Sequence, residues 1–549
     1  MLPMLFVAKG ETITVDSVGK LATILPDSVR FTIADLSVSG PLNGADLKLL
    51  QQIVTRTKTN KKNLNECLVN SVDLSGATIE EGKDGLKTKG GELPDGLFKG
   101  AKTLTKVVLP QGITTIGKSC FEGCESLTDI TLPETLTEIG NNAFEDCKSL
   151  PSLALPASLK TIGANAFEGC KAFTTIVIPA DVRKIENDAF KECSALTSIT
   201  LPENLTEIGG EAFMDCEALN NVIIPENVKE LGLSAFKKCT ALATIQMENV
   251  GKIGANAFED CKSLTTVTLK KISKIGSNAF EGCAALTTVA LEGSLDEIEA
   301  DMFKECTSLT TVSIPNSVKN IANEAFAECK SLDGITLPSG LTKIGTHAFE
   351  GCSALKELGI PNMVKSIGSS AFENCTSLDS VAINGFIEEI SSDLFRHCHN
   401  LRSITIPNTV RKIGSKAFQE CTALTSVTLP VALTSIGDDA FAKCTSLASV
   451  KMPVSVKEIG SSAFEECVML STVELSSALK KIGGSAFAKC TSLKEVILNT
   501  PAPPTISKST FKGTAPTFFI PRGSLSVYIA HKDWKNVSGY REKISTRQF

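Results

Sequence analysis

A short pattern of hydrophobic and polar positions dominates this chain, and residues 193–215 (CSALTSITLPENLTEIGGEAFMD) show one copy of it. The segment 199–201 alternates apolar and polar side chains with a period of two, which predicts a short β-strand with one buried face. The proline that follows ends this strand because it has no N–H to donate to a sheet. A second extended piece is predicted at 205–208, and a glycine then turns the chain. Residues 211–215 are predicted to form one helical or 3₁₀ turn that carries Phe213 inward.

This pattern repeats along most of the chain. Seventeen cysteines stand in one register, in steps of 23 residues except for two consecutive steps of 22. Their positions are 124, 147, 170, 193, 216, 239, 261, 283, 306, 329, 352, 375, 398, 421, 444, 467 and 490. A phenylalanine precedes each of them by three residues, and Phe98 and Phe511 continue the register on either side without a cysteine. A chain of 549 residues would otherwise suggest about three or four domains, but an internal repeat of this length overturns that expectation.

No single copy is large enough to bury its own apolar positions, so the copies must stack and share one continuous core. We therefore predict an α/β repeat solenoid, rich in β-strand, of about 18 coils of 22–23 residues with a cap at each end. The two shortened coils lack one residue at Met247–Val250 and at Leu269–Ile272, which predicts a local change of coil shape and no domain boundary. The turning glycine is replaced by a side chain in Glu186, Glu299, Ala322 and Ser391. Its slot is therefore predicted to have an ordinary φ and to favour glycine for close packing between coils.

Composition excludes several function classes. Lys+Arg is 55 and Asp+Glu is 61, giving a formal net charge of −6, which argues against a nucleic-acid footprint and against a polybasic membrane-binding module. Four histidines leave little material for histidine-based catalysis. The chain contains no G-x-S-x-G, P-loop, H-E-x-x-H or dinucleotide-binding motif. We expect a protein that is not an enzyme and that uses no cofactor and no metal.

The nineteen cysteines form the most conspicuous chemical feature. Their odd number prevents complete pairing within one chain, and the register cysteines occupy apolar slots of the repeat. Free cysteine behaves as a small hydrophobic residue, so we predict a ladder of buried free thiols, with Cys120 packed beside it. The segment His397-Cys398-His399 is the one hint of a metal site, but Cys398 should point inward and its neighbours outward. Converging ligands are needed to hold a metal ion, and this segment is not predicted to supply them.

The repeated pattern C-x-x-L-x-x-I-x-L-P-x-x-L-x-x-I-G-x-x-A-F-x-x resembles the BspA-like, or Treponema pallidum-type, class of leucine-rich repeat over about residues 98–514. The resemblance implies a right-handed leucine-rich-repeat solenoid. It also implies a secreted or cell-surface protein of host-associated bacteria or parasites, with roles in adhesion or host interaction. That family's repeat carries no enzymatic residues that could be transferred to this chain.

The flanks depart from the repeat and are predicted to cap it. We divide the chain into a candidate signal-peptide remnant (1–10), an N-terminal capping region (11–97), the BspA-like repeats (98–500) and a C-terminal cap (501–549). In the N-terminal region, strands are predicted at 31–38 and 68–74, with an amphipathic helix at 44–55 between them. In the tail, 518–521 is strand-like, and 524–534 is a predicted helix that carries Tyr528 and Trp534 for capping.

The outward positions of the first strand of each coil carry mostly hydroxyl side chains and few charges, whereas those of the second strand carry charged pairs. We call the first set the neutral face, and its members are Thr131, Thr175, Ser198, Thr200, Thr244, Thr266, Thr268, Thr288, Thr311, Thr336, Ser403, Thr405, Ser426 and Thr428. One interpretation is that these residues are soluble strand formers without a further role. The other is that they form a surface that binds a ligand.

The sequence therefore predicts a secreted or cell-surface repeat protein that binds macromolecules noncovalently. By resemblance, the expected partners are host extracellular or surface proteins, with glycans as a second class and neither nucleic acid nor membrane insertion. A glycan-binding surface component and a purely structural spacer are the alternatives. The oligomeric state and the ligand are not specified by the sequence.

Overall fold

The computed structural model describes residues 9–26, 30, 32–55 and 69–536. It divides into two compact units, residues 1–271 and 272–549, each of which is described by itself. The boundary falls inside the second shortened loop, Leu269–Ile272, where we expected only a change of coil shape. The candidate signal-peptide remnant lies outside the described residues except for its last two, which begin the first strand.

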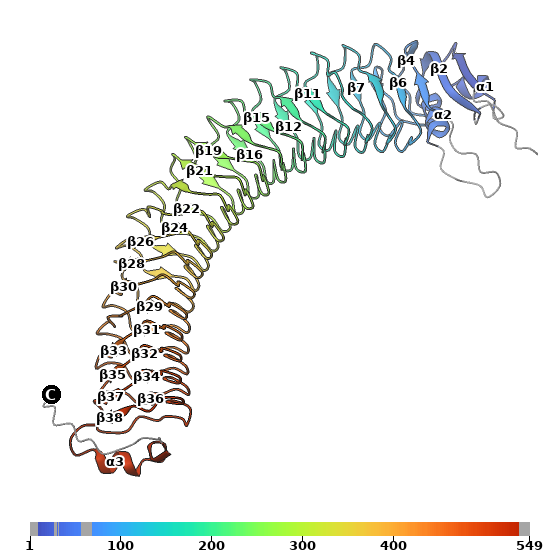
Figure 1. Cartoon of the computed structure of the whole chain (residues 1–549). Coiled ribbons are helices and arrows are strands. Elements are labelled where there is room, and N and C mark those ends of the chain that lie inside the picture. The colour runs from blue at the N-terminus through green and yellow to red at the C-terminus, as the bar shows by residue number, and fades with distance from the viewer. Residues whose placement is uncertain (1–8, 27–29, 31, 56–68, 537–549) are drawn as a thin grey trace, which may run out of the picture. The chain divides into compact units, whose positions relative to one another are not determined.

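In the first unit, the chain begins with elements that do not follow the repeat and then settles into coils that each contribute two short strands (Figure 1). The flanking elements are β1 (Lys9–Thr14), α1 (Leu21–Ile24), β2 (Ile33–Leu42), α2 (Gly44–Val54), β3 (Ser71–Asp73) and β4 (Ala77–Ile79). The first strand row of the coils contains β6 (Lys106–Val108), β8 (Asp129–Thr131), β11 (Thr175–Val177), β13 (Ser198–Thr200), β15 (Asn221–Ile223), β17 (Thr244–Gln246) and β19 (Thr266–Leu269). The second row contains β5 (Glu92–Leu93), β7 (Thr115–Ile116), β9 (Glu138–Ile139), β10 (Thr161–Ile162), β12 (Lys184–Ile185), β14 (Glu207–Ile208), β16 (Glu230–Leu231) and β18 (Lys252–Ile253).

The second unit has the same two rows. Its first row contains β21 (Thr288–Leu291), β23 (Thr311–Ser313), β26 (Glu357–Ile360), β28 (Ser380–Ile383), β30 (Ser403–Thr405), β33 (Ser449–Lys451), β35 (Thr472–Leu475), β37 (Glu495–Leu498) and β38 (Thr517–Phe519). Its second row contains β20 (Lys274–Ile275), β22 (Glu297–Ile298), β24 (Asn320–Ile321), β25 (Lys343–Ile344), β27 (Ser366–Ile367), β29 (Glu389–Ile390), β31 (Lys412–Ile413), β32 (Ser435–Ile436), β34 (Glu458–Ile459) and β36 (Lys481–Ile482). The unit closes with α3 (Leu525–Ala530) and the 3₁₀ turn η1 (Trp534–Asn536).

Neighbouring coils pair in parallel and in register, slot against slot, as in Thr175↔Ser198 and Lys184↔Glu207. The predicted β-rich repeat solenoid is thus confirmed, although the described chain makes about 21 turns instead of the expected 18. The flanks account for the difference. Strands β2 and β3 extend the first row before β6, and β38 extends it after β37, all in parallel pairing. The predicted helix and strands of the N-terminal region correspond to α2, β2 and β3, although Phe31 and Leu68 lie outside the described residues.

The register phenylalanines and cysteines fill the core. Within each unit, each ring lies on the ring of the next coil; Phe213, for example, stacks on Phe190 at 5.6 Å and on Phe236 at 5.2 Å, nearly parallel to both. The eighteen cysteines of the described chain are all buried and free, as predicted, and Cys67 lies outside that part. Register thiols point at the backbone of the preceding coil, as where the Cys239 Sγ donates to the Phe213 carbonyl oxygen at 3.1 Å. Burial in this apolar column raises the pKa of Cys124 to about 12, which keeps its thiol protonated.

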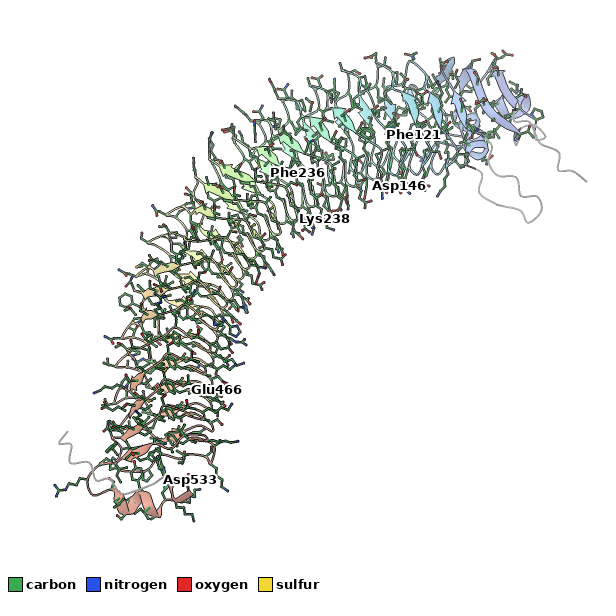
Figure 2. All side chains as sticks on the ribbon, in the orientation of Figure 1. Phe121, Asp146, Phe236, Lys238, Glu466 and Asp533 are labelled. Carbon is green, nitrogen blue, oxygen red and sulfur yellow. The ribbon has the colours of Figure 1, made fainter. Side chains whose placement is uncertain are left out.

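The segment around each phenylalanine corrects our prediction of a helical turn, and we call this part of the coils the turn row. Residues two before and two after the ring adopt left-handed backbone, for example Glu211 (φ 54°) and Asp215 (φ 59°), so no helix can form. Thirty residues other than glycine have this conformation in the described chain, all of them in these two slots. The turn is held instead by a third ladder between coils, in which the Phe213 N–H donates to the Ala235 carbonyl at 2.8 Å. Figure 2 places Asp146 and Lys238, which occupy the second of these slots, at the surface of the turn row.

The turning glycine after the second strand has an ordinary φ, as predicted from its replacements, and is constrained by space. A Cβ built on Gly140 would lie 2.9 Å from the Lys118 backbone nitrogen, and one on Gly232 would lie 2.4 Å from the Gly209 carbonyl carbon. Contacts this short would force the coils apart. Close packing between coils therefore explains the preference for glycine.

Side chains from the flanks cover the core at each end of the repeat. At the start, Asn43 and Asp46 form a capping box for α2, and the Asp46 carboxylate also accepts hydrogen bonds from the Gly19 and Leu21 N–H groups. At the other end, the Tyr528 hydroxyl donates to the Thr500 carbonyl and the Trp534 Nε1 donates to the Pro504 carbonyl, both at 2.8 Å. Both rings are buried, as expected for capping side chains. No helix among the described residues is long and apolar enough to span a bilayer.

Candidate functional site

All fourteen residues of the neutral face are solvent-exposed. Eleven of them lie on strands of the first row, whereas Thr336, Ser426 and Thr428 lie in coils whose first segment does not form a regular strand. The structure brings the residues together within runs of consecutive strands, since slots pair with identical slots. Three coils that lack a regular first strand interrupt these runs, between β8 and β11, between β23 and β26 and between β30 and β33.

The longest uninterrupted part of the neutral face in the first unit covers β11, β13, β15 and β17. Its outward side chains are uncharged, and two of them are apolar: Val177 is 65% exposed and Ile223 is 58% exposed. Thr200 lies between them in the same column, paired with Val177 on one side. In the neighbouring column the Thr244 hydroxyl donates to the Asn221 side-chain oxygen at 3.1 Å. This part of the face therefore offers hydroxyl, amide and methyl groups without a formal charge.

Some hydroxyls of the first row have structural roles, but they occupy a different slot. The Thr197 hydroxyl donates to the Thr174 carbonyl of the preceding coil at 3.0 Å, and the Thr128 hydroxyl donates to the Thr105 carbonyl at 3.2 Å. Among the fourteen predicted residues, all of which lie in the described chain, only Thr244 makes a side-chain hydrogen bond. Their polar groups are consequently available to a ligand.

Charges surround the neutral face and are largely paired between coils. The Lys106 ammonium lies 2.8 Å from the Asp129 carboxylate at the beginning of the row, and this hydrogen-bonded contact raises the pKa of Lys106. In the second row, Lys412 pairs with Glu389 at 2.7 Å. Such exposed pairs contribute little stability each, but those of the second row distinguish it from the neutral face.

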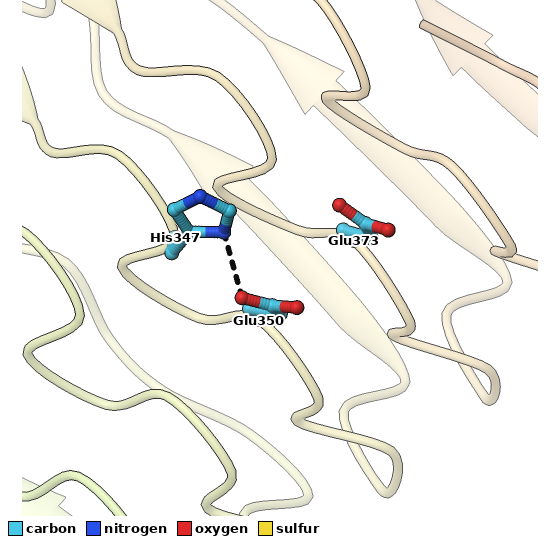
Figure 3. A group of neighbouring side chains, drawn as sticks. All are labelled: His347, Glu350 and Glu373. Atoms are coloured by element: carbon cyan, nitrogen blue, oxygen red, sulfur yellow. Dashed lines mark ion pairs between the residues drawn. The ribbon is translucent and has the colours of Figure 1, made fainter. Parts of the chain in front are cut away.

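A different cluster lies in the turn row of the second unit and consists of His347, Glu350 and Glu373 (Figure 3). One potential ligand atom from each residue lies within 4.8 Å of the others. The His347 Nδ1 is 2.6 Å from a Glu350 carboxylate oxygen. Among the described residues, this is the one group of three or more histidine, cysteine, aspartate or glutamate side chains so arranged. We call it the His–Glu cluster.

The segment 397–399, by contrast, does not assemble a group of metal ligands. The Cys398 Sγ is buried and donates to the Phe372 carbonyl at 3.2 Å. The flanking rings lie outside the core, where the His397 Nδ1 contacts the Asn374 side-chain oxygen and the His399 Nδ1 contacts the Glu420 carbonyl, both at 3.0 Å. These contacts agree with the inward cysteine and outward histidines expected from the repeat.

Sequence reasoning missed the His–Glu cluster because it considered only the segment 397–399, two coils further along the chain, as a source of metal ligands. The signal was available in the slots of the repeat. His347 stands two residues before its phenylalanine, and Glu350 and Glu373 each stand one residue after theirs in consecutive coils. Those slots meet on one edge of the turn row. Elsewhere, Asp188 and Lys191 of one coil occupy the slots of His347 and Glu350 and lie 3.0 Å apart. Lys237 and Glu259 of successive coils occupy the slots of Glu350 and Glu373 and lie 2.7 Å apart.

Stacked coils with two parallel strand rows and, within each unit, a column of stacked phenylalanine rings define a leucine-rich-repeat solenoid. A family model for the BspA-type leucine-rich repeat region, six copies long, matches residues 91–218, 183–310, 296–425 and 411–525, and this chain belongs to that family. The resemblance inferred from the sequence is thereby confirmed. No curated protein matches the chain significantly.

Several solved bacterial structures are similar to this chain. A leucine-rich repeat protein from Bacteroides ovatus is 25% identical, over 82% of this chain and 92% of that one, with a TM-score of 0.37. A leucine-rich cell surface protein from Faecalibacterium prausnitzii is 28% identical, over 59% and 86%, with a TM-score of 0.37. The Treponema pallidum leucine-rich repeat protein is 26% identical, over 37% and 77%, with a TM-score of 0.25.

Proposed function

We propose that this BspA-type repeat protein is secreted or displayed at a cell surface and binds extracellular macromolecules noncovalently through its neutral face. The observation that carries the proposal is the uncharged, exposed surface over β11, β13, β15 and β17, where Val177 and Ile223 flank Thr200. Exposed apolar groups among unsatisfied hydroxyls favour a surface that is covered when a partner binds. Extracellular or surface proteins of a host are the proposed partners.

Binding through this face would be extended and individually weak. Tyrosine, tryptophan and arginine supply most strong contacts at protein interfaces, and residues 98–514 contain neither tyrosine nor tryptophan. Affinity would then come from many similar contacts along successive coils. Because the face carries no formal charge, binding should depend little on salt concentration.

A binding screen against immobilised matrix proteins, plasma proteins and polysaccharides, at low and high salt, tests the proposal. Thr200→Lys places a charge between the two exposed apolar side chains and is expected to weaken a protein hit by about tenfold or more. Thr161→Lys is the matched control, since Thr161 is an equally exposed threonine of the same unit but lies in the second strand row. Equal loss in both variants, or binding that disappears at high salt, would contradict the use of this face.

The screen also separates the two alternatives. Asn221 and Thr244 present hydrogen-bonding groups of the kind that recognise sugar hydroxyls, so a polysaccharide hit weakened by Thr200→Lys would assign the face to glycans. A blank across the whole panel would favour a structural spacer that presents another part of the cell surface.

A further inference from the structure

The His–Glu cluster differs from every other use of the same slots in the described chain. Where a glutamate follows the phenylalanine in other coils, the facing slot usually supplies a donor, as with Asn142 toward Glu145 and Ser462 toward Glu465. In the coil of Phe303 the protein supplies its own cation, because Lys304 contacts Asp301 at 3.2 Å and Glu324 at 2.6 Å. At the His–Glu cluster two carboxylates from adjacent coils face one imidazole.

Negative charge accumulates at this point and is only partly compensated. The Glu373 side chain is only 11% exposed. Arg396 holds one of its oxygens at 3.2 Å but also faces Asp393 at 3.6 Å. A further cation at the cluster would be attracted electrostatically.

The imidazole nitrogen is the second observation that points to a ligand. The His347 Nδ1 atom is buried and makes no hydrogen bond, and it lies 2.6 Å from a Glu350 carboxylate oxygen in an ion-pair contact, while the His347 side chain as a whole is 37% exposed. A buried nitrogen lone pair beside a carboxylate is unfavourable unless a proton or a metal ion lies between them. The geometry therefore places one nitrogen and two carboxylates side by side (Figure 3), with one ligand atom of each within 4.8 Å of the others.

We propose that His347, Glu350 and Glu373 bind one divalent transition-metal cation of the zinc type. Zinc binds histidine nitrogen and carboxylate oxygen at about 2.0–2.2 Å, which places tetrahedral ligand atoms about 3.3 Å apart. Small rotations of the three side chains would produce that spacing from the present separations of up to 4.8 Å. An imidazole ligand favours zinc, copper, nickel or iron over magnesium and calcium. The remaining coordination position would be open to water or to an external ligand.

The full-length protein, stripped of metal, should bind one equivalent of Zn²⁺ in calorimetry or equilibrium dialysis. His347→Gln and Glu373→Gln, which keep side-chain size, are each expected to weaken binding more than about tenfold. His399→Gln is the control, because it removes another histidine of the same unit that contacts the Glu420 carbonyl outside the cluster. Unchanged affinity in His347→Gln, equal loss in His399→Gln, or no bound equivalent would overturn the site.

Cobalt substitution keeps the test decisive even if a variant is less stable. Bound Co²⁺ should give visible d–d bands without a sulfur-to-metal charge-transfer band, since the proposed ligands are nitrogen and oxygen. A strong charge-transfer band would assign the metal to the cysteines and overturn the proposal. Zn²⁺ should also raise the unfolding temperature of the unmodified protein and of His399→Gln, but not that of His347→Gln. An equal rise in His347→Gln would contradict the site.

Discussion

The phenylalanine column makes a sharp prediction about how the solenoid loses its structure. Phe213 is fully buried and stacks on a ring in the coil before and in the coil after. Replacing a buried phenylalanine by alanine costs about 3–5 kcal/mol from lost burial and the cavity that remains. The two ring contacts place Phe213→Ala toward the upper part of that range, since aromatic pairs add about 0.5–1.5 kcal/mol each beyond burial.

The loss should be local. A coil contacts mainly its two neighbours, so stability is approximately a sum of coil and interface contributions. A cost of about 4 kcal/mol corresponds to an increase of roughly a thousandfold in the local opening constant. Hydrogen exchange followed by mass spectrometry should show faster exchange in peptides from residues 190–236, with peptides from 395–441 in the second unit unchanged. Urea unfolding followed by circular dichroism measures the accompanying loss of stability.

Phe386→Ala provides the matched control for this prediction. The Phe386 side chain is 69% exposed in the loop between the two strand rows, so its removal should change stability by less than about 0.5 kcal/mol. Unchanged exchange in 190–236 for Phe213→Ala, or an equal cost for Phe386→Ala, would refute the stacking argument. Uniform exchange along both units would refute the nearest-neighbour description of the solenoid.

Three further changes test other parts of the structure. The eighteen described thiols should react with Ellman's reagent only after denaturation. Burial shields their sulfur atoms and raises the pKa of thiols such as Cys490 to about 12. Rapid labelling of several thiols in the native protein would contradict this. Lys238 has a φ of 60°, in a slot that glycine occupies at position 169. Lys238→Gly should therefore raise the free energy of unfolding by up to about 1 kcal/mol in a urea titration, whereas Lys238→Val should lower it. A glycine variant that is less stable than the unmodified protein would count against the argument. The Lys191 ammonium lies 2.7 Å from the Glu211 carboxylate and lowers its pKa. The pair therefore stabilises the fold at pH values above the ordinary pKa of a carboxylate, and this stabilisation is lost as the pH falls through the lowered pKa of Glu211. Glu211→Gln should therefore cost up to about 1 kcal/mol at pH 7 and flatten the acid limb of a stability–pH profile, and parallel profiles would show that the pair contributes nothing.

Burial was predictable from the sequence, because each slot of the repeat has a fixed side-chain character. The alternation around Thr200, the inward Phe213 and the cysteine ladder all follow from a period that recurs seventeen times. The close approach between coils at the turning glycine was also predictable. Some copies carry a residue with a side chain there, so the position does not require a positive φ, and close packing is the remaining reason for glycine. These features depend on which residues avoid water, and the sequence records that directly.

Backbone conformation in the turn row was not predictable in the same way. Glu211 and Lys238 themselves give no local sign of left-handed backbone. The hint lay in other copies of the same slots, where glycine (as at 123, 169, 282 and 351), asparagine or aspartate often stands. The hydrogen bonds that favour this conformation run to the next coil, so they appear only once the coils are stacked. The meeting of His347 with Glu373 has the same origin, since it joins slots of two successive coils.

The third ladder, in which alternate N–H groups of the turn row, such as those of Glu211, Phe213 and Asp215, donate to the following coil, has a mechanical consequence. Its hydrogen bonds lie along the stacking direction, so tension on the chain would open them one coil at a time instead of shearing many together. Each released coil of 23 residues would lengthen the chain by about 80 Å. A solenoid of this kind yields to a pulling force in steps, and it limits the load on whatever is attached while the remaining coils keep their shape.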